Sequence, residues 1–126
     1  MKFVQLSDRK LSSNEQVTGE AHLERIFNAQ RDRGVQLAVV NFQNGSITHW
    51  HDHPGEQILY VVEGQCRFGN KEGENIIANP GDAIYIPPGE VHWHGAVNGQ
   101  NMSHISVTNV GPPNWMEPVS NDEAKI

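Results

Sequence analysis

Three of the chain's seven histidines alternate in the stretch "THWHDHPGEQ", residues 48–57. In a β-strand, side chains two positions apart point to the same face, about 7 Å from each other. His51 and His53 would therefore project together, and both could bind one cation at about 2.1 Å. The "PGE" turn would bring Gln57, at the start of the next strand, back beside them. The alternative is a polar strand end with solvated histidines, and this stretch alone favours neither.

A second stretch, "GDAIYIPPGEVHWHGA", carries two more alternating histidines. After its Pro-Pro-Gly turn, His92, His94 and Ala96 share one strand face. The alternative is a pair of surface histidines. The bulky tryptophan between them indicates at least half-burial, and buried imidazoles need hydrogen-bond partners. Two such strands favour a shared site more strongly than either strand does alone.

A third strand-like stretch, "NMSHISVTN", places His104, Ser106 and Thr108 on one face. If this polar face lines the same interior, His104 belongs to the pocket. Otherwise it is an ordinary core or surface histidine, and the sequence alone leaves both interpretations open.

Turn sequences recur along the chain and separate short runs of β-branched and aromatic residues, which predicts an all-β sandwich or barrel. No segment from 35 to 110 has the length and period of a helix. The segment 17–30 is ambiguous, and its alternation favours an edge strand. The tail 111–126 contains three prolines and is expected to be irregular. We predict a single domain over 1–126, with a barrel core at about 35–110 and N-terminal strands or an arm over 1–34.

Composition narrows the class of protein. The 126 residues carry a formal net charge of −6 and no large basic cluster, so we expect no nucleic-acid partner. No stretch resembles a signal peptide or approaches the roughly 20 apolar residues of a membrane helix, so we expect a cytoplasmic protein without a membrane partner. The lone Cys66 is expected to be a small core residue.

The residues from Gly45 to Gly64 and the stretch "GDAIYIPPGEVHWHGA" resemble the two sequence motifs of cupins, with matching spacing at every fixed position. Two identities depart from the usual motifs, because Gln57 replaces a glutamate and Ala96 replaces an asparagine. The resemblance implies a double-stranded β-helix, or jelly-roll barrel, with a metal in the barrel mouth. It also implies a homodimer or homotetramer. The metal ligands that it implies are His51, His53, Gln57 and His92.

A narrower similarity covers nearly the whole chain. The patterns "HxHPxxQ", "PPGEVHWHGA", "MSHISV" and "NWMEPVS" resemble small cupins that act as manganese-dependent hydroxynitrile lyases, and relatives named after carboxymuconolactone decarboxylase. This implies one divalent transition metal per chain. Manganese is favoured, although ligand type alone also allows iron, zinc, nickel or cobalt. It further implies acid/base residues at Thr48, His94 and His104.

One conflict follows from strand alternation. Strict alternation puts His49 on the face of His51 and His53, and Thr48 on the opposite face, whereas the resemblance favours Thr48 in the pocket. Both hold only if a bulge interrupts the strand between them.

The neutral side chain of Gln57 also has a chemical consequence. Three imidazoles and an amide leave a divalent cation with its full charge, which weakens metal binding and makes a stronger Lewis acid. From strand parity, the apolar pocket lining is predicted to be Ala38, Val40, Leu59, Ala96 and Met102.

These features predict a metal-dependent lyase acting on a small hydroxyl- or carbonyl-bearing molecule such as a cyanohydrin, with the pocket histidines as acid and base. A metal-dependent dioxygenase or isomerase is an alternative, and so is a non-enzymatic module that binds a small ligand. The additional histidines favour catalysis, because a binding module has no need of extra titratable groups near pH 7.

Overall fold

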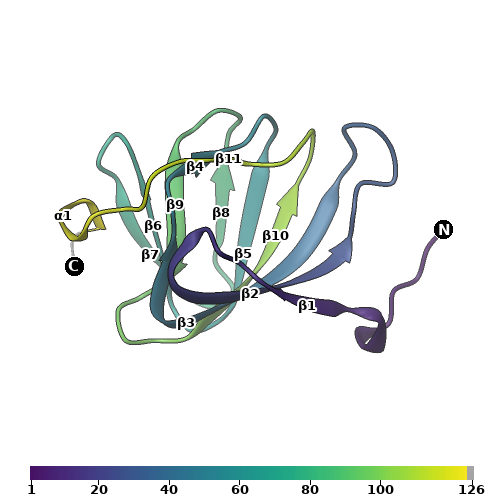
Figure 1. Cartoon of the computed structure of the whole chain (residues 1–126), viewed down its shortest axis with the longest axis horizontal. Coiled ribbons are helices and arrows are strands. Elements are labelled where there is room, and N and C mark those ends of the chain that lie inside the picture. Colours follow the sequence, from purple (N-terminus) through teal and green to yellow (C-terminus); the bar gives the residue numbers. More distant parts are fainter. Residues whose placement is uncertain (125–126) are drawn as a thin grey trace.

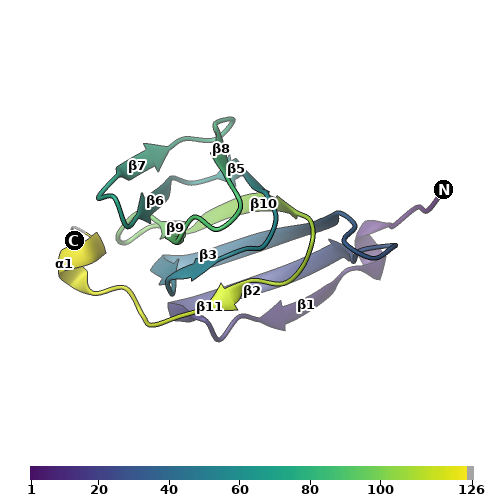
Figure 2. The ribbon, with the colours of Figure 1, turned by 90° about the horizontal axis from the view of Figure 1, so that it is seen from above.

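The computed structural model describes residues 1–124, and its strands curve around a common interior (Figure 1, Figure 2). All pairings are antiparallel. The first sheet contains, in spatial order, β1 (Lys10–Ser13), β2 (Val17–Phe27), β3 (Gln36–Thr48), β10 (Met102–Thr108), β5 (Gln57–Glu63) and β8 (Ala83–Ile86). The second contains β7 (Asn75–Ala78), β6 (Cys66–Asn70), β9 (His92–Ala96), β4 (His51–Asp52) and β11 (Asn114–Trp115). This nearly closed barrel confirms the all-β jelly-roll fold predicted from the sequence.

Of the segment 17–30, which was ambiguous in the sequence, Val17–Phe27 form the strand β2, which pairs with β3 over most of its length. The prediction of an edge strand was wrong, because β1 pairs with the other side of β2 from His22 to Arg25. Helices contribute little to the fold: a 3-10 turn, η1 (Leu6–Asp8), and one short helix, α1 (Asn121–Ala124). Among the described residues, neither is long and apolar enough to cross a membrane.

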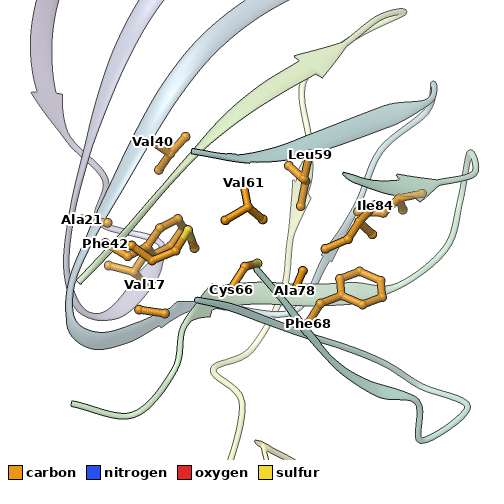
Figure 3. Close-up of a cluster of buried hydrophobic side chains, with 13 residues drawn as sticks. Val17, Ala21, Val40, Phe42, Leu59, Val61, Cys66, Phe68, Ala78 and Ile84 are labelled. Atoms are coloured by element: carbon orange, nitrogen blue, oxygen red, sulfur yellow. The ribbon is translucent and has the colours of Figure 1, made fainter. Parts of the chain in front are cut away.

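The main core fills the interior between the two sheets, at one end of the barrel (Figure 3). It follows from alternation along each strand: in β5, for example, Leu59 and Val61 are buried while Ile58 and Tyr60 are exposed. Cys66 belongs to this core, as expected, and burial raises the pKa of its thiol to about 12. The members are Val17, Ala21, Val40, Phe42, Leu59, Val61, Cys66, Phe68, Ala78, Ile84, Ile86, Ala96 and Met102.

A second, smaller core lies on the other face of β9 and is closed by the C-terminal tail. Trp50 and Trp93 are its largest side chains, and Met116, Val119 and Ala124 of the tail cover them. Every residue of β9 is therefore buried, although its inward and outward side chains contact different cores.

The tail is more regular than the sequence predicted. Asn114–Trp115 pair with Asp52 and His51 as strand β11, and Asn121–Ala124 form a helical turn. The tail prolines precede or separate these pieces, so they do not prevent either one. The last two residues of the predicted irregular tail, 125 and 126, lie outside the described residues.

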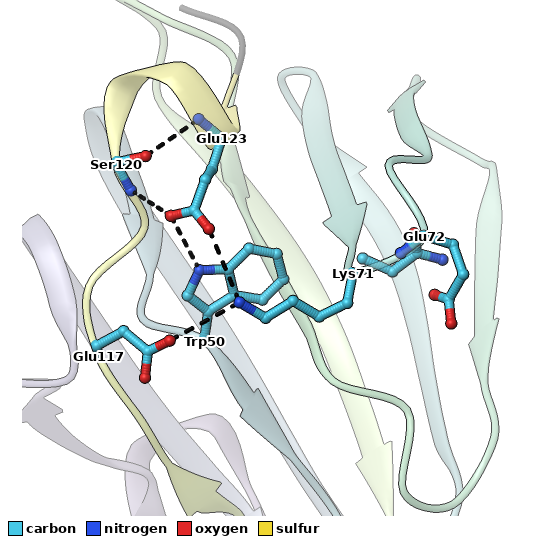
Figure 4. Close-up of polar contacts among 7 residues, drawn as sticks. Trp50, Lys71, Glu72, Glu117, Ser120 and Glu123 are labelled. Atoms are coloured by element: carbon cyan, nitrogen blue, oxygen red, sulfur yellow. Dashed lines mark hydrogen bonds and ion pairs between the residues drawn. The ribbon is translucent and has the colours of Figure 1, made fainter.

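Polar contacts hold the tail against the barrel (Figure 4). The Lys71 ammonium lies 3.7 Å from the centroid of the Trp50 ring and 3.7 Å from a carboxylate oxygen of each of Glu117 and Glu123. The indole N–H of Trp50 donates to Glu123 at 3.4 Å. The Lys71 ammonium thus links Trp50, the residue before His51, to Glu117 and Glu123 of the tail.

Gly95 permits the junction between the two sheets, where β3 and β9 pair at Ile47 and Gly95. A Cβ atom at position 95 would lie 2.3 Å from the backbone oxygen of Ser46 and 2.5 Å from the Cα of Ile47. Only a residue without a side chain allows the strands to approach this closely.

We therefore expect Gly95→Ala to lower the free energy of unfolding by about 1–3 kcal/mol, the range typical of overpacked interiors. Urea denaturation followed by circular dichroism measures this. Gly111→Ala is the matched control, because its new methyl group would meet only the ring of Pro54 at an ordinary 3.4 Å. Equal stabilities of the two variants would contradict the proposed role of Gly95.

Candidate functional site

Three histidines from both predicted motifs meet inside the barrel. His51 and His92 are directly paired across β4 and β9, and His53 follows at the end of β4. Their ligand atoms lie within 4.8 Å of one another, and all three side chains are buried. The backbone N–H of Gly89, in the Pro-Pro-Gly turn, donates to the carbonyl of His53 at 2.9 Å. The turn of the second motif therefore anchors the end of the first.

Hydrogen bonds determine which ring nitrogen of two of these histidines carries a proton. His51 Nδ1 lies 2.9 Å from the carbonyl oxygen of His49, and His92 Nδ1 lies 2.8 Å from that of Glu90. Because a carbonyl oxygen can only accept, each Nδ1 carries the hydrogen and each neutral ring keeps a free lone pair on Nε2. This is the tautomer that a metal ligand needs.

Gln57 completes the donor set from the neighbouring strand. Its amide nitrogen donates to Ser106 Oγ at 2.9 Å, which aims its Oε1 at His92 Nε2, 3.2 Å away. Two acceptor atoms thus face each other, an arrangement that a cation bound to both would stabilise. The chemistry of these three imidazoles and one amide fits a divalent transition metal.

Burial keeps these imidazoles uncharged near neutral pH. Burial, together with the neighbouring His92, lowers the pKa of His53 to about 4, and burial lowers the pKa of His92 to about 4. Burial, followed by the proximity of His92, lowers the pKa of His51 well below its usual value. Neutral rings have the lone pairs that metal binding requires.

Next to this group lies a pair of directly hydrogen-bonded histidines. His94 Nδ1 and His104 Nε2 are 3.0 Å apart, and both rings are buried. Burial lowers the pKa of His104 to about 4, and burial together with His104 lowers that of His94 well below its usual value. The remaining nitrogens, His94 Nε2 and His104 Nδ1, are buried without any hydrogen-bond partner among the described residues.

The structure places the Thr48 side chain, and not that of His49, at this cavity. Thr48 is only 1% exposed, and its hydroxyl accepts a hydrogen bond of 3.1 Å from the backbone N–H of His94. Strict alternation fails because residues 49 and 50 leave the sheet. Their N–H groups donate to Gln16 and Glu117 instead of to a partner strand.

A cavity of about 470 Å³ opens from this cluster to the barrel mouth. Of the five predicted lining residues, Ala38 and Val40 lie in its wall. Leu59, Ala96 and Met102 do not line it and contribute only to the main core. Strand parity correctly placed all five on the inward face, but it carries no information about depth along the barrel.

The wall also contains residues that the sequence reasoning missed. Phe42 lies on the inward face of β3, where its parity with Ala38 and Val40 was a usable signal. Leu23 and Arg25 come from β2, and Trp115 comes from the tail. The Trp115 ring lies 4.4 Å from that of His51. No local pattern indicates that these two flanking segments reach the cavity.

Comparison with known proteins agrees with this geometry. The Cupin domain family matches residues 38–108, the span that contains all the predicted ligands. The chain belongs to the cupin family. It is 34% identical over 110 residues to an (R)-mandelonitrile lyase from Granulicella tundricola, a match covering 84% of this chain and 83% of that protein.

Two further similarities place this cupin among its relatives. It is 32% identical over 80 residues to a quercetin 2,3-dioxygenase from Bacillus subtilis, covering 60% of this chain but only 23% of the dioxygenase. It also superposes on the crystal structure of a cupin-like protein from Thermotoga maritima with a TM-score of 0.81 and 31% identity. That superposition covers 97% of this chain and 90% of the other.

We predict that His51→Ala abolishes stoichiometric metal binding, because it removes one of three imidazoles that converge on the same point. Elemental analysis of the purified wild-type cupin should give about one transition-metal equivalent per chain, and the variant far less. His22→Ala, on the outer face of β2, is the control and should keep the metal. Unchanged metal content in His51→Ala would refute the ligand assignment.

Proposed function

We propose that this cupin is a metal-dependent enzyme with lyase-type chemistry on a small hydroxyl- or carbonyl-bearing molecule such as a cyanohydrin. The observation that carries the proposal is His94 Nε2. This atom is buried without a partner, in a ring that lines the same cavity as His51 and His53. An unpaired buried polar atom typically costs about 1–3 kcal/mol, so such an atom, in a ring that lines a cavity, is well suited to receive a substrate group.

The proposed metal ligands are His51, His53, Gln57 and His92, and manganese is the favoured ion. A divalent metal held there would act as a Lewis acid towards a substrate oxygen. Because all four side chains are neutral, none of them would reduce the charge of that ion. Ser106 holds the Gln57 amide with its oxygen towards His92, so the fourth ligand is oriented in advance.

The chain's own residues can move the proton of such a reaction. In the tautomer with its hydrogen on Nδ1, His94 donates to His104 Nε2 and offers a free lone pair on its own Nε2. His94 Nε2 would take the proton of the substrate hydroxyl while the carbon–cyanide bond breaks to leave an aldehyde. The same proton then returns to the departing cyanide, so no other reactant is required.

Thr48 and His104 would support this step in different ways. The Thr48 oxygen accepts from the His94 backbone, so its hydroxyl hydrogen is free to donate into the cavity, towards a substrate oxygen or nitrile. His104 fixes the tilt of the His94 ring and can share its charge while the proton is held. A pure binding module would not require this arrangement.

The similarities to known proteins support a lyase over a dioxygenase. The match to the mandelonitrile lyase covers most of both proteins, whereas the match to the quercetin dioxygenase covers a small part of that enzyme. A metal-dependent dioxygenase nevertheless uses the same kind of centre, and it is the second candidate. Oxygen uptake with quercetin, in place of aldehyde release from mandelonitrile, would support that candidate.

We predict that the manganese-loaded cupin releases benzaldehyde from mandelonitrile and that His94→Ala lowers kcat about 10²–10⁴-fold, the usual effect of losing a positioned acid or base. Absorbance of the aldehyde measures the rate. His104→Ala should give a smaller loss, and His22→Ala, whose side chain pairs with Glu20 at the surface, should give none. If mandelonitrile and quercetin are both inert with the manganese- and iron-loaded protein, a binding module becomes the better interpretation.

We also propose that the chain forms a homodimer in which the N-terminal arm, residues 1–13, docks on the outer face of β5 in a second copy. The arm exposes Phe3, Leu6 and Leu11 at 82%, 73% and 63%, and the part of it that precedes β1 projects away from the barrel (Figure 2). The β5 face exposes Ile58 and Tyr60, both 46%. The arm carries three basic side chains against one carboxylate in a chain of net charge −6, so attraction between opposite charges favours this contact.

Light scattering should therefore give a mass of at least two 14.1 kDa chains. Leu6→Asp and Ile58→Asp should each lower it, because each places a charge in the proposed contact. Ile77 of β7 is 60% exposed and lies outside the proposed contact, so the control variant Ile77→Asp should leave the mass unchanged. A monomeric wild-type protein would contradict the proposal.

A further inference from the structure

The cavity of the candidate site changes character from its inner end to its mouth. At the inner end, the apolar side chains of Val40 and Phe42, which belong to the main core, lie beside His94 and His104. Ser106 lies beside Gln57, to which it is hydrogen-bonded. The other polar lining residues come from the turn before β2 and from positions near the strand ends: Ser13, Asn14, Glu15, Gln16, Arg25, Gln36 and Thr108. A ligand that reaches from the histidines to these residues would have a polar reacting group and a second polar group, with a body between them that contacts the wall at Leu23 and Ala38.

Arg25 is the single cation among the residues that line this cavity. Arg25 lies on the same, inward face of β2 as Ala21 and Leu23. Ala21 is buried, and Leu23 packs against the main core. One of its N–H groups donates to Gln36 Oε1 at 2.9 Å, which holds the guanidinium at the cavity wall. The other donors of the guanidinium remain available.

The charges on the two faces of β2 are arranged differently. On the outer face, Glu24 pairs with Arg9 at 3.6 Å, and His22 lies 3.1 Å from Glu20. On the inner face, Arg25 has no carboxylate within ion-pair distance in the described part of the chain. An unpaired guanidinium on a concave wall concentrates anions from solution, and its planar fork matches a carboxylate.

We propose that the substrate of this site carries an anionic group, a carboxylate, which Arg25 binds at the cavity mouth while the reacting carbon lies at the histidines. This rests on the proposed function for the inner end of the cavity. The strands β5, β10, β3 and β2 are neighbours in that order, so Arg25 lies three strand spacings, about 14 Å along the curved sheet, from the strand of Gln57. Both side chains project inward, so the gap left between their tips suits an aromatic or short aliphatic body.

Glu15 is the other charged side chain at the mouth, on the turn between β1 and β2. It makes no ion pair with Arg25. If the mouth binds an anion, Glu15 opposes that binding, and its neutralisation should strengthen it. Replacing Glu15 and replacing Arg25 should therefore change anion binding in opposite directions. A non-specific disturbance of the mouth by either substitution would not give this result.

The experiment compares equilibrium binding of 4-formylbenzoate and benzaldehyde, measured by ligand-observed NMR at low ionic strength. We expect the wild-type protein to bind the carboxylated aldehyde at least tenfold more tightly, the lower end for a charge-assisted pair. Arg25→Gln should lose this preference and leave benzaldehyde binding unchanged, and Arg25→Lys should keep part of it. Glu15→Gln should keep or increase it, and added salt should reduce it in the wild type.

Equal binding of the two aldehydes by the wild type would overturn the proposal. So would a preference that survives in Arg25→Gln, because the carboxylate would then bind another group, such as the metal. Arg25 is exposed, so its replacement should leave the melting temperature unchanged. Failure of the proposed lyase function is a separate result: mandelonitrile would be inert while the preference for 4-formylbenzoate and its dependence on Arg25 remain.

Discussion

The burial of five uncharged imidazoles in one small barrel is the constraint on which the rest of this structure depends. Removing them from water lowers every one of their pKa values, so each ring must be neutral and must find hydrogen-bond partners of the right kind. Backbone carbonyls supply partners for His51 and His92, and His94 and His104 pair with each other. The free Nε2 lone pairs of His51 and His92 suit a metal, and in the described residues His53 Nδ1, His94 Nε2 and His104 Nδ1 have no hydrogen-bond partner, so the protein's own groups do not complete the set.

The architecture serves this cluster by bringing two distant motifs together. The first motif runs from Gly45 to Gly64 and the second begins at Gly81, and they meet because β4 pairs with β9 and the turn at Gly89 bonds to His53. The junction of β3 and β9 at Gly95 closes the barrel beside Thr48. The tail, held by Lys71, covers the outer face of β9 and contributes Trp115 to the cavity (Figure 4).

Much of the site was accessible from sequence because its signals are local. Alternation places His51 with His53, and His92 with His94, wherever the strand lies. The spacing of the motifs, rather than any single residue, indicated the family and hence the fold. His104 remained open because a single histidine on a third strand has no local partner. Only the 3.0 Å contact with His94 assigns it to the cavity.

The sequence by itself thus indicated the fold class through the motif spacing, and it placed His51 with His53 and His92 with His94, because strand parity acts over a few positions. The convergence of His51, His53 and His92 on one point depends on the pairing of β4 with β9. Only the tertiary structure decided the choice between Thr48 and His49, the depth of Leu59, Ala96 and Met102, and the inward position of Arg25. These depend on where strands end, how far along the barrel a residue lies and which distant segment closes the mouth. Such features are set by long-range pairing, which no periodicity within one strand records.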